Sequence, residues 1–562
     1  MDAWADVSTV DQHVAYLGQW TNWSRGTVLG ATLTLTKRDG SLVIAFAAFF
    51  VTLVASRVWA IICLCCHQIY SSDKPQGVTY HQRQVILRNS PSPQSAIWKL
   101  LRLGWVSRTI STANARKTIV PFSLALICLA GFAGVTYVLP LLSSSAGDEI
   151  LLRPGVCGVV HGTEVLSNLT EYHELVFPLY SNQITSAANY AQQCYAKSTG
   201  TLGCTGLLKD RIPSVVQFNA TCPFDEDMCR TKTSNIFLDT GYINSHEHFG
   251  LNTPMGNRVL YRKTLQCAPL ITEGYTTTKQ SSAGNYTSYH HGFLVTGSLS
   301  NQSLLDGLYM IEDVKHQYRL GSIFEDDSYP KPSSDYQVEA FESQIFNGSL
   351  VGNSEYFPSA KLRRDDGDSY IVFLSGNGVF FIQPSPDAWY RASTLAGTLD
   401  SAVTDSEAEY FTFDEPASPL GCVQQIQICF EALPKGKQCG PLTSFYDAAN
   451  RAFDESPSET ATVHLRWVLN QVIGTSISQV LKVLGAHALT SRQSLVLSSQ
   501  GPIAANQWQL DVVHWWATSL ALTQSNFIDS IVGPSDRRLD KYVVPPDDLE
   551  ICTSQVCEPP PT

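Results

Sequence analysis

The chain has 562 residues, of which 44% are apolar and 16% are charged, and its formal net charge is -12. Its apolar and aromatic content is enough to build a large core, which excludes a disordered chain. The negative net charge provides no basic field for phosphates, so no nucleic-acid partner is expected.

The N-terminal part begins with a polar tail at 1–40 and continues with an apolar run at 41–66. A helix needs about 20 apolar residues to cross a bilayer core. We therefore predict an exoplasmic tail at 1–40 and a first transmembrane helix at 41–66. Arg57 interrupts the run, either as a functional charge inside the membrane or as a side chain that reaches the headgroups. The second apolar run offers no acidic partner, which favours the headgroups.

The loop at 67–117 carries eight Lys or Arg residues and one acidic residue. Because short cytoplasmic loops are rich in Lys and Arg, the loop is predicted to be cytoplasmic and to lead into a second span at 118–142. Both ends of the chain then lie outside the cytoplasm. The expected location is the plasma membrane or a membrane of the secretory pathway, with the ectodomain extracellular or lumenal.

Two further features lie on the cytoplasmic side. Residues 97–108 interleave Trp and Leu with Lys and Arg, which is typical of a helix on an anionic lipid surface and equally of an ordinary linker. Membrane lipids are the expected partners of such a helix. The end of the first span is rich in cysteine, and lipidation is a hypothesis for Cys63, Cys65 and Cys66.

Sequons for N-glycosylation avoid the basic loop. The N-x-S/T pattern without a central proline occurs once in the tail and five times after the second span. This distribution agrees with an exoplasmic location of both regions. The candidate acceptors are Asn22, Asn168, Asn219, Asn285, Asn301 and Asn347.

The region after the second span contains eleven cysteines. In an oxidising compartment they predict up to five disulfides and one odd thiol, in a connectivity that the spacing leaves open. The spacing C-x6-C occurs at 222/229 and at 422/429 and marks two candidate local loops. The disulfide candidates are Cys157, Cys194, Cys204, Cys222, Cys229, Cys267, Cys422, Cys429, Cys439, Cys552 and Cys557.

The first and longest part of this region, 143–455, is predicted to be rich in strands. Strand-like runs occur at 258–271 and 291–299. Two apolar runs within 369–382 flank a Ser-Gly-Asn-Gly turn, which predicts a β-hairpin.

The pattern becomes helical at 456–533, with apolar residues at helical spacing in 460–484 and 508–532. Neither segment is apolar enough to span a bilayer, so both are predicted to pack on the strands. A Pro-rich tail follows at 534–562. The predicted fold class is a membrane protein with two N-terminal transmembrane helices and a large α+β ectodomain.

Candidate chemistry in the ectodomain is sparse. His246 and His248 would lie on one side of a strand and could hold a metal, with His290 or His291 as a third ligand. The alternative is a polar loop with unrelated histidines. The sequence has no nucleophile elbow, P-loop, dinucleotide fingerprint or zincin motif. No cofactor is expected, and enzymatic activity stays open, with a non-enzymatic protein favoured.

Seven segments spread over most of the chain carry a family resemblance. They are YHQRQVILRN at 80–89, GLNTP and VLYRKTLQCAPL within 250–270, LRRDDGDSYIVFLSGNGVFF at 362–381, PDAWYRA at 386–392, LGCVQQIQIC at 420–429 and WWATSLALTQ at 515–524. Together they resemble a family of integral membrane proteins of filamentous fungi, with paired N-terminal spans and a cysteine-containing ectodomain. The resemblance implies a fungal membrane protein and no particular chemistry, with an accessory role in secondary metabolism as one option.

The leading hypothesis is a protein that presents a glycosylated, disulfide-linked ectodomain for binding. Its ligand would be a wall polymer, a metabolite or a partner protein. The alternative is a membrane-tethered enzyme that acts outside the cytoplasm on glycans or secreted metabolites.

Overall fold

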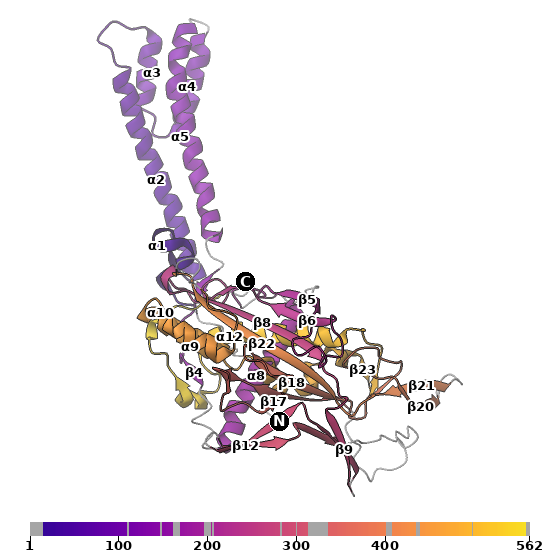
Figure 1. Cartoon of the computed structure of the whole chain (residues 1–562). Coiled ribbons are helices and arrows are strands. Elements are labelled where there is room, and N and C mark those ends of the chain that lie inside the picture. The colour runs from indigo at the N-terminus through magenta and orange to yellow at the C-terminus, as the bar shows by residue number, and fades with distance from the viewer. Residues whose placement is uncertain are drawn as a thin grey trace, which may run out of the picture. The chain divides into compact units, whose positions relative to one another are not determined.

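The computed structural model describes residues 15–108, 112–145, 149–160, 169–195, 204, 207–281, 284–298, 301–312, 335–400, 407–433, 439–496 and 498–557. They form two compact units, and each is described by itself (Figure 1). The helical unit comprises 17–20 and 32–150. The strand-rich unit comprises 15–16, 21–31 and 151–557.

Two long helices dominate the helical unit, α2 at Lys37–Ile69 and α5 at Thr112–Ser145. Each contains the whole of its predicted span and extends beyond it at both ends. The side chain of Arg57 in α2 is exposed. The predicted apolar runs are therefore helical, and each helix continues for three to six residues beyond the predicted span at either end.

The basic loop between the two long helices contains α3 at Val78–Arg88 and α4 at Pro93–Arg108. α4 contributes Ala96 and Leu100 to a small core, while Trp98 is 72% exposed on its other side. Residues 97–108 are thus part of a packed helix rather than a plain linker. The buried members of this core are Trp59, Cys63, Cys66, Leu87, Ala96, Leu100, Ala125 and Cys128.

Three segments of the described chain are long and apolar enough to cross a membrane by length and composition, against the two that were predicted. They are Lys37–Ile69, Thr118–Val138 and Glu459–Ser494. The prediction that 460–484 is too polar to qualify is therefore wrong by this measure. The third segment differs from the others because 44% of its most apolar window is buried, against 17% and 22%.

The third segment is also not one helix. It divides into α10 at Glu459–Val472 and α11 at Ile477–Leu484, because Gly474 adopts a φ of 80° between them. A disulfide joins Cys157, before this segment, to Cys552, after it. A single crossing there would put these two cysteines on opposite sides of a membrane, so the segment belongs to the strand-rich unit.

The centre of the strand-rich unit is an antiparallel seven-stranded sheet with the order β14-β18-β22-β8-β6-β5, in which β7 pairs with β8. Nearly every residue of β18 and β22 is buried, as expected for strands covered on both faces. The strand bounds are β5 Val215–Ala220, β6 Asn235–Asp239, β7 Ile243–Asn244, β8 Val259–Pro269, β14 Gln337–Ser343, β18 Asp368–Ser375 and β22 Ser418–Phe430.

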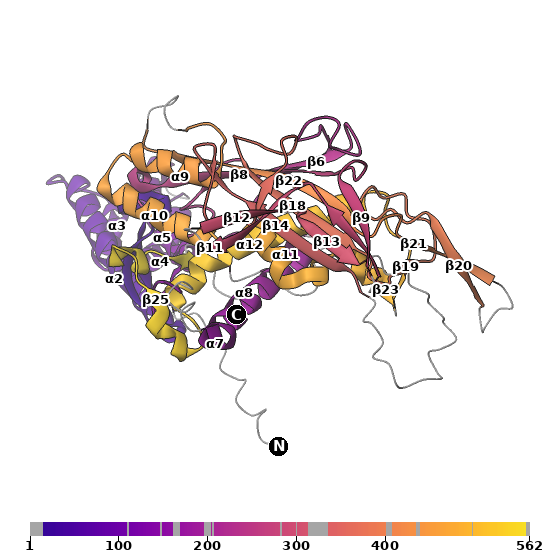
Figure 2. The ribbon, with the colours of Figure 1, turned by 60° about the horizontal axis from the view of Figure 1, so that its bottom comes forward.

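Helices cover one face of this sheet (Figure 2). Lys263 of β8 contacts Ser519 of α12, the long buried helix at Gln507–Val532 that matches the predicted 508–532. α12 packs in turn on α8 at Phe177–Tyr190 and on α11. α8 and α9, at Phe445–Asp454, lie inside the part predicted to be strand-rich, so the predicted boundary at 455/456 does not separate two layers.

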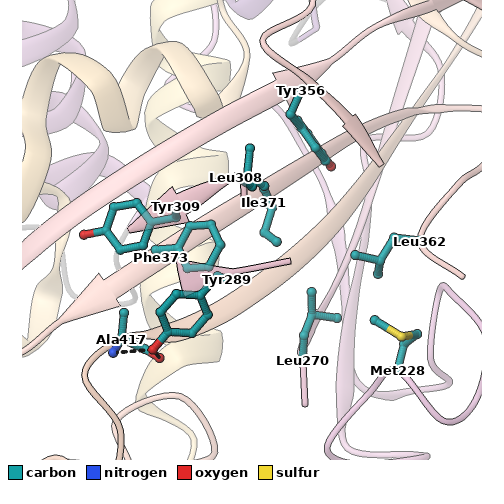
Figure 3. Close-up of a cluster of buried hydrophobic side chains, with 10 residues drawn as sticks. All are labelled: Met228, Leu270, Tyr289, Leu308, Tyr309, Tyr356, Leu362, Ile371, Phe373 and Ala417. Carbon is teal, nitrogen blue, oxygen red and sulfur yellow. Dashed lines mark hydrogen bonds between the residues drawn. The ribbon is translucent and has the colours of Figure 1, made fainter. Parts of the chain in front are cut away.

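Small sheets cover the other face. One contains β9, β10 and β13, and the other contains β11, β12 and β17. Beneath them Tyr289 and Tyr309 pack on Phe373 of β18, and the Tyr289 hydroxyl bonds both backbone groups of Ala417 (Figure 3). The bounds are β9 Thr276–Ser281, β10 Gly284–Tyr289, β11 Gly292–Ser298, β12 Asn301–Asp306, β13 Tyr309–Glu312 and β17 Tyr356–Pro358.

The predicted hairpin at 369–382 is wrong. The chain does turn after β18, where Asn377 and Gly378 have positive φ angles. However, β19 at Phe380–Phe381 leaves the central sheet and pairs with other strands, placing Phe381 opposite Phe411. The two apolar runs flank a turn between sheets.

The end of the chain is not loose over its described part. β25 at Val543–Val544 pairs with β4 at Val159–Val160, and the Cys157–Cys552 disulfide fixes the same region. The predicted tail at 534–562 is therefore part of the strand-rich unit up to residue 557.

Candidate functional site

Hydrogen bonds hold the segment before α2 on the strand-rich unit. We call this arrangement the N-terminal clasp, made by Trp23, Ser24, His246, Asn252 and Arg258. The Trp23 N–H donates to Asn252 Oδ1 at 2.9 Å, and Arg258 Nη2 donates to the Trp23 carbonyl at 3.2 Å. Ser24 Oγ lies 2.8 Å from His246 Nε2. The chain before α2 and the chain after α5 therefore build one surface.

Both ring nitrogens of His246 are in contact with neighbours. Nδ1 lies 3.2 Å from the Thr253 N–H, which donates to it, and also 3.2 Å from the Leu251 carbonyl oxygen, while Nε2 lies against Ser24 Oγ. These contacts fit either tautomer of the neutral ring. The arrangement is suited to holding the segment in place.

The metal hypothesis for His246 and His248 loses its geometric basis. Both residues lie in a turn after β7 rather than on one side of a strand. His248 Nδ1 accepts the Asn244 N–H at 3.1 Å, and burial lowers the pKa of His248. Among the described residues, no group of three or more His, Cys, Asp or Glu side chains is placed to hold a metal.

The neighbouring histidines 290 and 291 lie between β10 and β11, and their rings have different surroundings. His291 is buried, donates from Nε2 to the Ile271 carbonyl at 2.8 Å and stacks on Tyr275. Burial lowers the pKa of His291 to about 4, so it is neutral. His290 faces outward with its side chain 29% exposed. Only His290 can meet a ligand.

The outward side of β9 and β10 carries polar side chains near His290. We call it the polar face and define it by Thr277, Tyr286, Ser288, His290 and Asp306. Thr277 pairs with Ser288, so both side chains share the side opposite the buried Tyr289. Asp306 ends β12 and is exposed.

His290 joins Thr277 and Asp306 in a hydrogen-bonded line. Asp306 Oδ1 lies 3.1 Å from His290 Nδ1, and His290 Nε2 lies 2.8 Å from Thr277 Oγ1. The carboxylate favours the proton on Nδ1, which leaves Nε2 as an acceptor for the threonine hydroxyl. Such a line can bind hydroxyl groups of a ligand, and it has the order of groups in a nucleophile–base–carboxylate triad.

A second reactive pair is inaccessible. Lys263 Nζ donates to Ser519 Oγ at 2.7 Å and to the Thr475 carbonyl at 3.3 Å, and burial lowers the pKa of Lys263 to about 7. However, Ser519 is fully buried and Lys263 is 2% exposed. The pair joins the central sheet to α12 and has no path for a substrate.

Ten of the eleven cysteines that follow α5 form disulfides. Cys222 pairs with Cys229 as a local loop, whereas the second C-x6-C spacing misleads because Cys422 and Cys429 take other partners. The side chain of Cys557 lies outside the described residues. The pairs are Cys157–Cys552, Cys194–Cys204, Cys222–Cys229, Cys267–Cys422 and Cys429–Cys439.

The lipidation candidates differ in access. Cys63 and Cys66 are buried in the small core of the helical unit, each 5% exposed. Cys65 is exposed. Of the three, only Cys65 presents its thiol to an acyltransferase in this conformation.

The sequons also differ in access. Asn219 and Asn347 are exposed and Asn285 is half-buried, whereas Asn22 is 6% exposed and its Oδ1 accepts the Ser24 N–H at 2.9 Å. Asn168 and the side chain of Asn301 lie outside the described residues. Among the acceptors that the structure describes, Asn22 is therefore the one with a buried side chain.

Sequence reasoning missed most of these contacts. Asn252 lies in a turn far along the chain from Trp23, and Thr277 and Asp306 lie on different strands from His290. Their side chains meet only after strands pair, and single-sequence spacing carries no signal for that.

The comparisons with known proteins give no relative. No protein-family model matches the sequence, and no curated protein or solved structure matches it. The class that the fold itself defines is an α+β domain, crosslinked by disulfides, in one chain with two long apolar helices.

Proposed function

We propose that the protein is a two-span integral membrane protein that presents a disulfide-bonded, glycosylated ectodomain outside the cytoplasm for binding. The single observation that carries the proposal is the N-terminal clasp. Its two sides, the segment before α2 and the domain after α5, are separated in the chain by both helices. If these helices cross a membrane, the two sides can meet only when the total number of crossings is even. The resemblance to fungal membrane proteins agrees with this arrangement.

Disulfides support the side of the membrane. Five disulfides within one unit support an oxidising compartment, extracellular or lumenal. The basic loop would then face the cytoplasm, where an excess of Lys and Arg is expected. An accessory role in a biosynthetic pathway is compatible with this location.

The polar face is the proposed binding surface. Thr277, Ser288 and His290 offer hydroxyl and imidazole groups, and Tyr286 offers an aromatic ring beside them. Carbohydrates are bound by such combinations of hydrogen-bonding groups and a ring, because sugars have both polar edges and apolar faces. We therefore propose a hydroxyl-rich ligand, a wall glycan being the simplest case.

The test is binding of soluble chitin and β-glucan oligosaccharides to the full chain in nanodiscs, measured by calorimetry. His290→Ala should weaken binding at least tenfold, because it removes the central group of the polar face. His487→Ala, at an exposed histidine elsewhere, is the matched control and should bind like wild type. Equal binding by both variants would contradict the assignment of the face.

A second candidate function is hydrolysis outside the cytoplasm, favoured by the Thr277–His290–Asp306 line. His290 Nε2 would take the Thr277 proton as the hydroxyl oxygen attacks an ester carbonyl, and would return it to the departing alkoxide. Water would then cleave the acyl-threonine and release the acid. Turnover of acetylated sugars that is lost in Thr277→Val and kept in His487→Ala would favour this function over binding alone.

A further inference from the structure

The most exposed large apolar side chains of the strand-rich unit lie side by side. Val28 is 83% exposed and Leu29 is 81% exposed. Both belong to α1, a single helical turn at Gly26–Leu29 that projects from the segment held by the clasp. Exposed apolar residues that occur singly need no explanation, but two adjacent ones held on a rigid turn suggest a contact surface.

The turn is held rigidly. The Gly30 N–H donates to the Gly26 carbonyl at 3.0 Å, and the Asn22 N–H donates to the Gly30 carbonyl at 2.7 Å. A side chain at Gly30 would put its Cβ 2.1 Å from the Asn22 carbonyl oxygen, so this close approach requires glycine. The clasp fixes the preceding residues, Trp23 and Ser24, on the strand-rich unit. Val28 and Leu29 are therefore presented outward at little further entropic cost.

The sequence places this turn close to the proposed membrane. α1 ends eight positions before Lys37, where α2 begins, which limits their separation to about 28 Å of extended chain. The residues around it suit a membrane–water boundary, with the half-buried Trp23 before the turn and the exposed Arg25 beside it. Aromatic and basic residues favour the headgroup region, whereas Val28 and Leu29 favour the acyl chains.

We infer that Val28 and Leu29 insert into the exoplasmic leaflet that α2 crosses and that the occupant of this apolar turn is lipid. The inference rests on the proposed function, because it needs α2 to cross the membrane. Through the clasp, the insertion would give the strand-rich unit a third attachment to the bilayer besides α2 and α5. A second copy of the chain is the alternative occupant.

The test is photocrosslinking of the full chain in phosphatidylcholine nanodiscs, with one protein molecule in each disc. Three variants each carry benzoylphenylalanine at one position. The positions are Val28, Phe46 in α2, which is 68% exposed, and Met310 in the strand-rich unit, which is 66% exposed. We expect lipid adducts at Val28 and Phe46, at least tenfold above Met310.

The outcomes separate the two proposals. Adducts at Phe46 without adducts at Val28 would overturn the inference and leave the two-span proposal intact. No adducts at Phe46 would overturn the two-span proposal itself. Equal adducts at Val28 and Met310, or a protein–protein crosslink from Val28 in doubly loaded discs without lipid adducts, would also overturn the inference.

Discussion

The Ser24 hydroxyl lies 2.8 Å from Nε2 of His246, although 222 positions separate the two residues in the chain. Both long apolar helices lie between them. The contact therefore ties the short segment before α2 to the domain that follows α5, and it links the packing of the domain to the topology of the whole chain. Asn252 and Arg258 reinforce the same link.

Asn252→Ala should release the N-terminal segment. The side chain accepts the Trp23 N–H and donates to the Thr21 carbonyl at 2.7 Å, so the variant loses two hydrogen bonds. A loss of about 1–3 kcal/mol is expected, which raises local opening roughly tenfold or more. Trypsin should therefore cleave after the exposed Arg25 faster in the variant, by the same factor as the rise in local opening. Mass spectrometry measures this rate. The control Gln280→Ala changes an exposed strand residue and should leave this rate unchanged; a rate unaltered by Asn252→Ala would refute the clasp.

Tyr289→Phe should destabilise the support of the polar face. The Tyr289 hydroxyl donates to the Ala417 carbonyl and accepts the Ala417 N–H, both at 2.8 Å. Phenylalanine keeps the ring but leaves two buried backbone groups without this partner, at a cost of about 2 kcal/mol. The melting temperature should fall by several degrees. Tyr286→Phe, on the outward side of the same strand, should change it little, and equal shifts would argue against this role of Tyr289.

Asp529 should make stability depend on pH. Burial raises the pKa of Asp529 from 3.8 to about 6, while Gln183 Nε2 donates to its Oδ2 at 3.1 Å. Because the folded protein keeps a proton that the unfolded chain loses, this contribution is complete below pH 4 and declines as the pH rises to about 6. Asp529→Asn cannot ionise and still offers an acceptor to Gln183.

The variant should therefore gain stability relative to wild type between pH 4 and pH 7, by about 3 kcal/mol, because the pKa difference is about two units. Urea unfolding at both pH values measures the difference. A gap that stays constant between them would show that Asp529 does not titrate in this range.

Glycan occupancy should follow exposure rather than the presence of a sequon. Asn219 and Asn347 are exposed, whereas the Asn22 side chain is buried and bonded to the Ser24 N–H. The glycans are released enzymatically in water that carries heavy oxygen, which converts each glycosylated Asn to a labelled Asp. Mass spectrometry should then find this label at Asn219 and Asn347 and not at Asn22. Full occupancy at Asn22 would mean that the clasp forms differently in the mature protein.

Local patterns predicted the elements that depend on neighbouring residues. The run at 258–271 contains β8, and the helical spacing at 508–532 matches α12, which ends at Gly533 with a φ of 86°. In both, the residues that decide the structure lie within the segment itself. Gly474, in contrast, divides a predicted helix into α10 and α11 because its positive φ breaks the turn.

Choices of partner could not be predicted from local patterns. Phe381 follows an apolar run and a turn, yet it pairs with Phe411 rather than with β18. Cys267 and Cys422 meet because β8 and β22 place them directly opposite each other, 155 positions apart. Pairing across such distances is decided by the register of the whole sheet.

Protease protection on sealed microsomes, with different tags at the two ends of the chain, tests the proposed topology most directly. We expect both tags to be protected, both to become sensitive after detergent, and cleavage before detergent only in the basic loop at 67–117. Digestion of one tag while the other stays protected would separate Ser24 from His246 by a membrane and would contradict the clasp. Digestion of both tags would place the disulfide-bonded domain in the cytoplasm and contradict the proposed function.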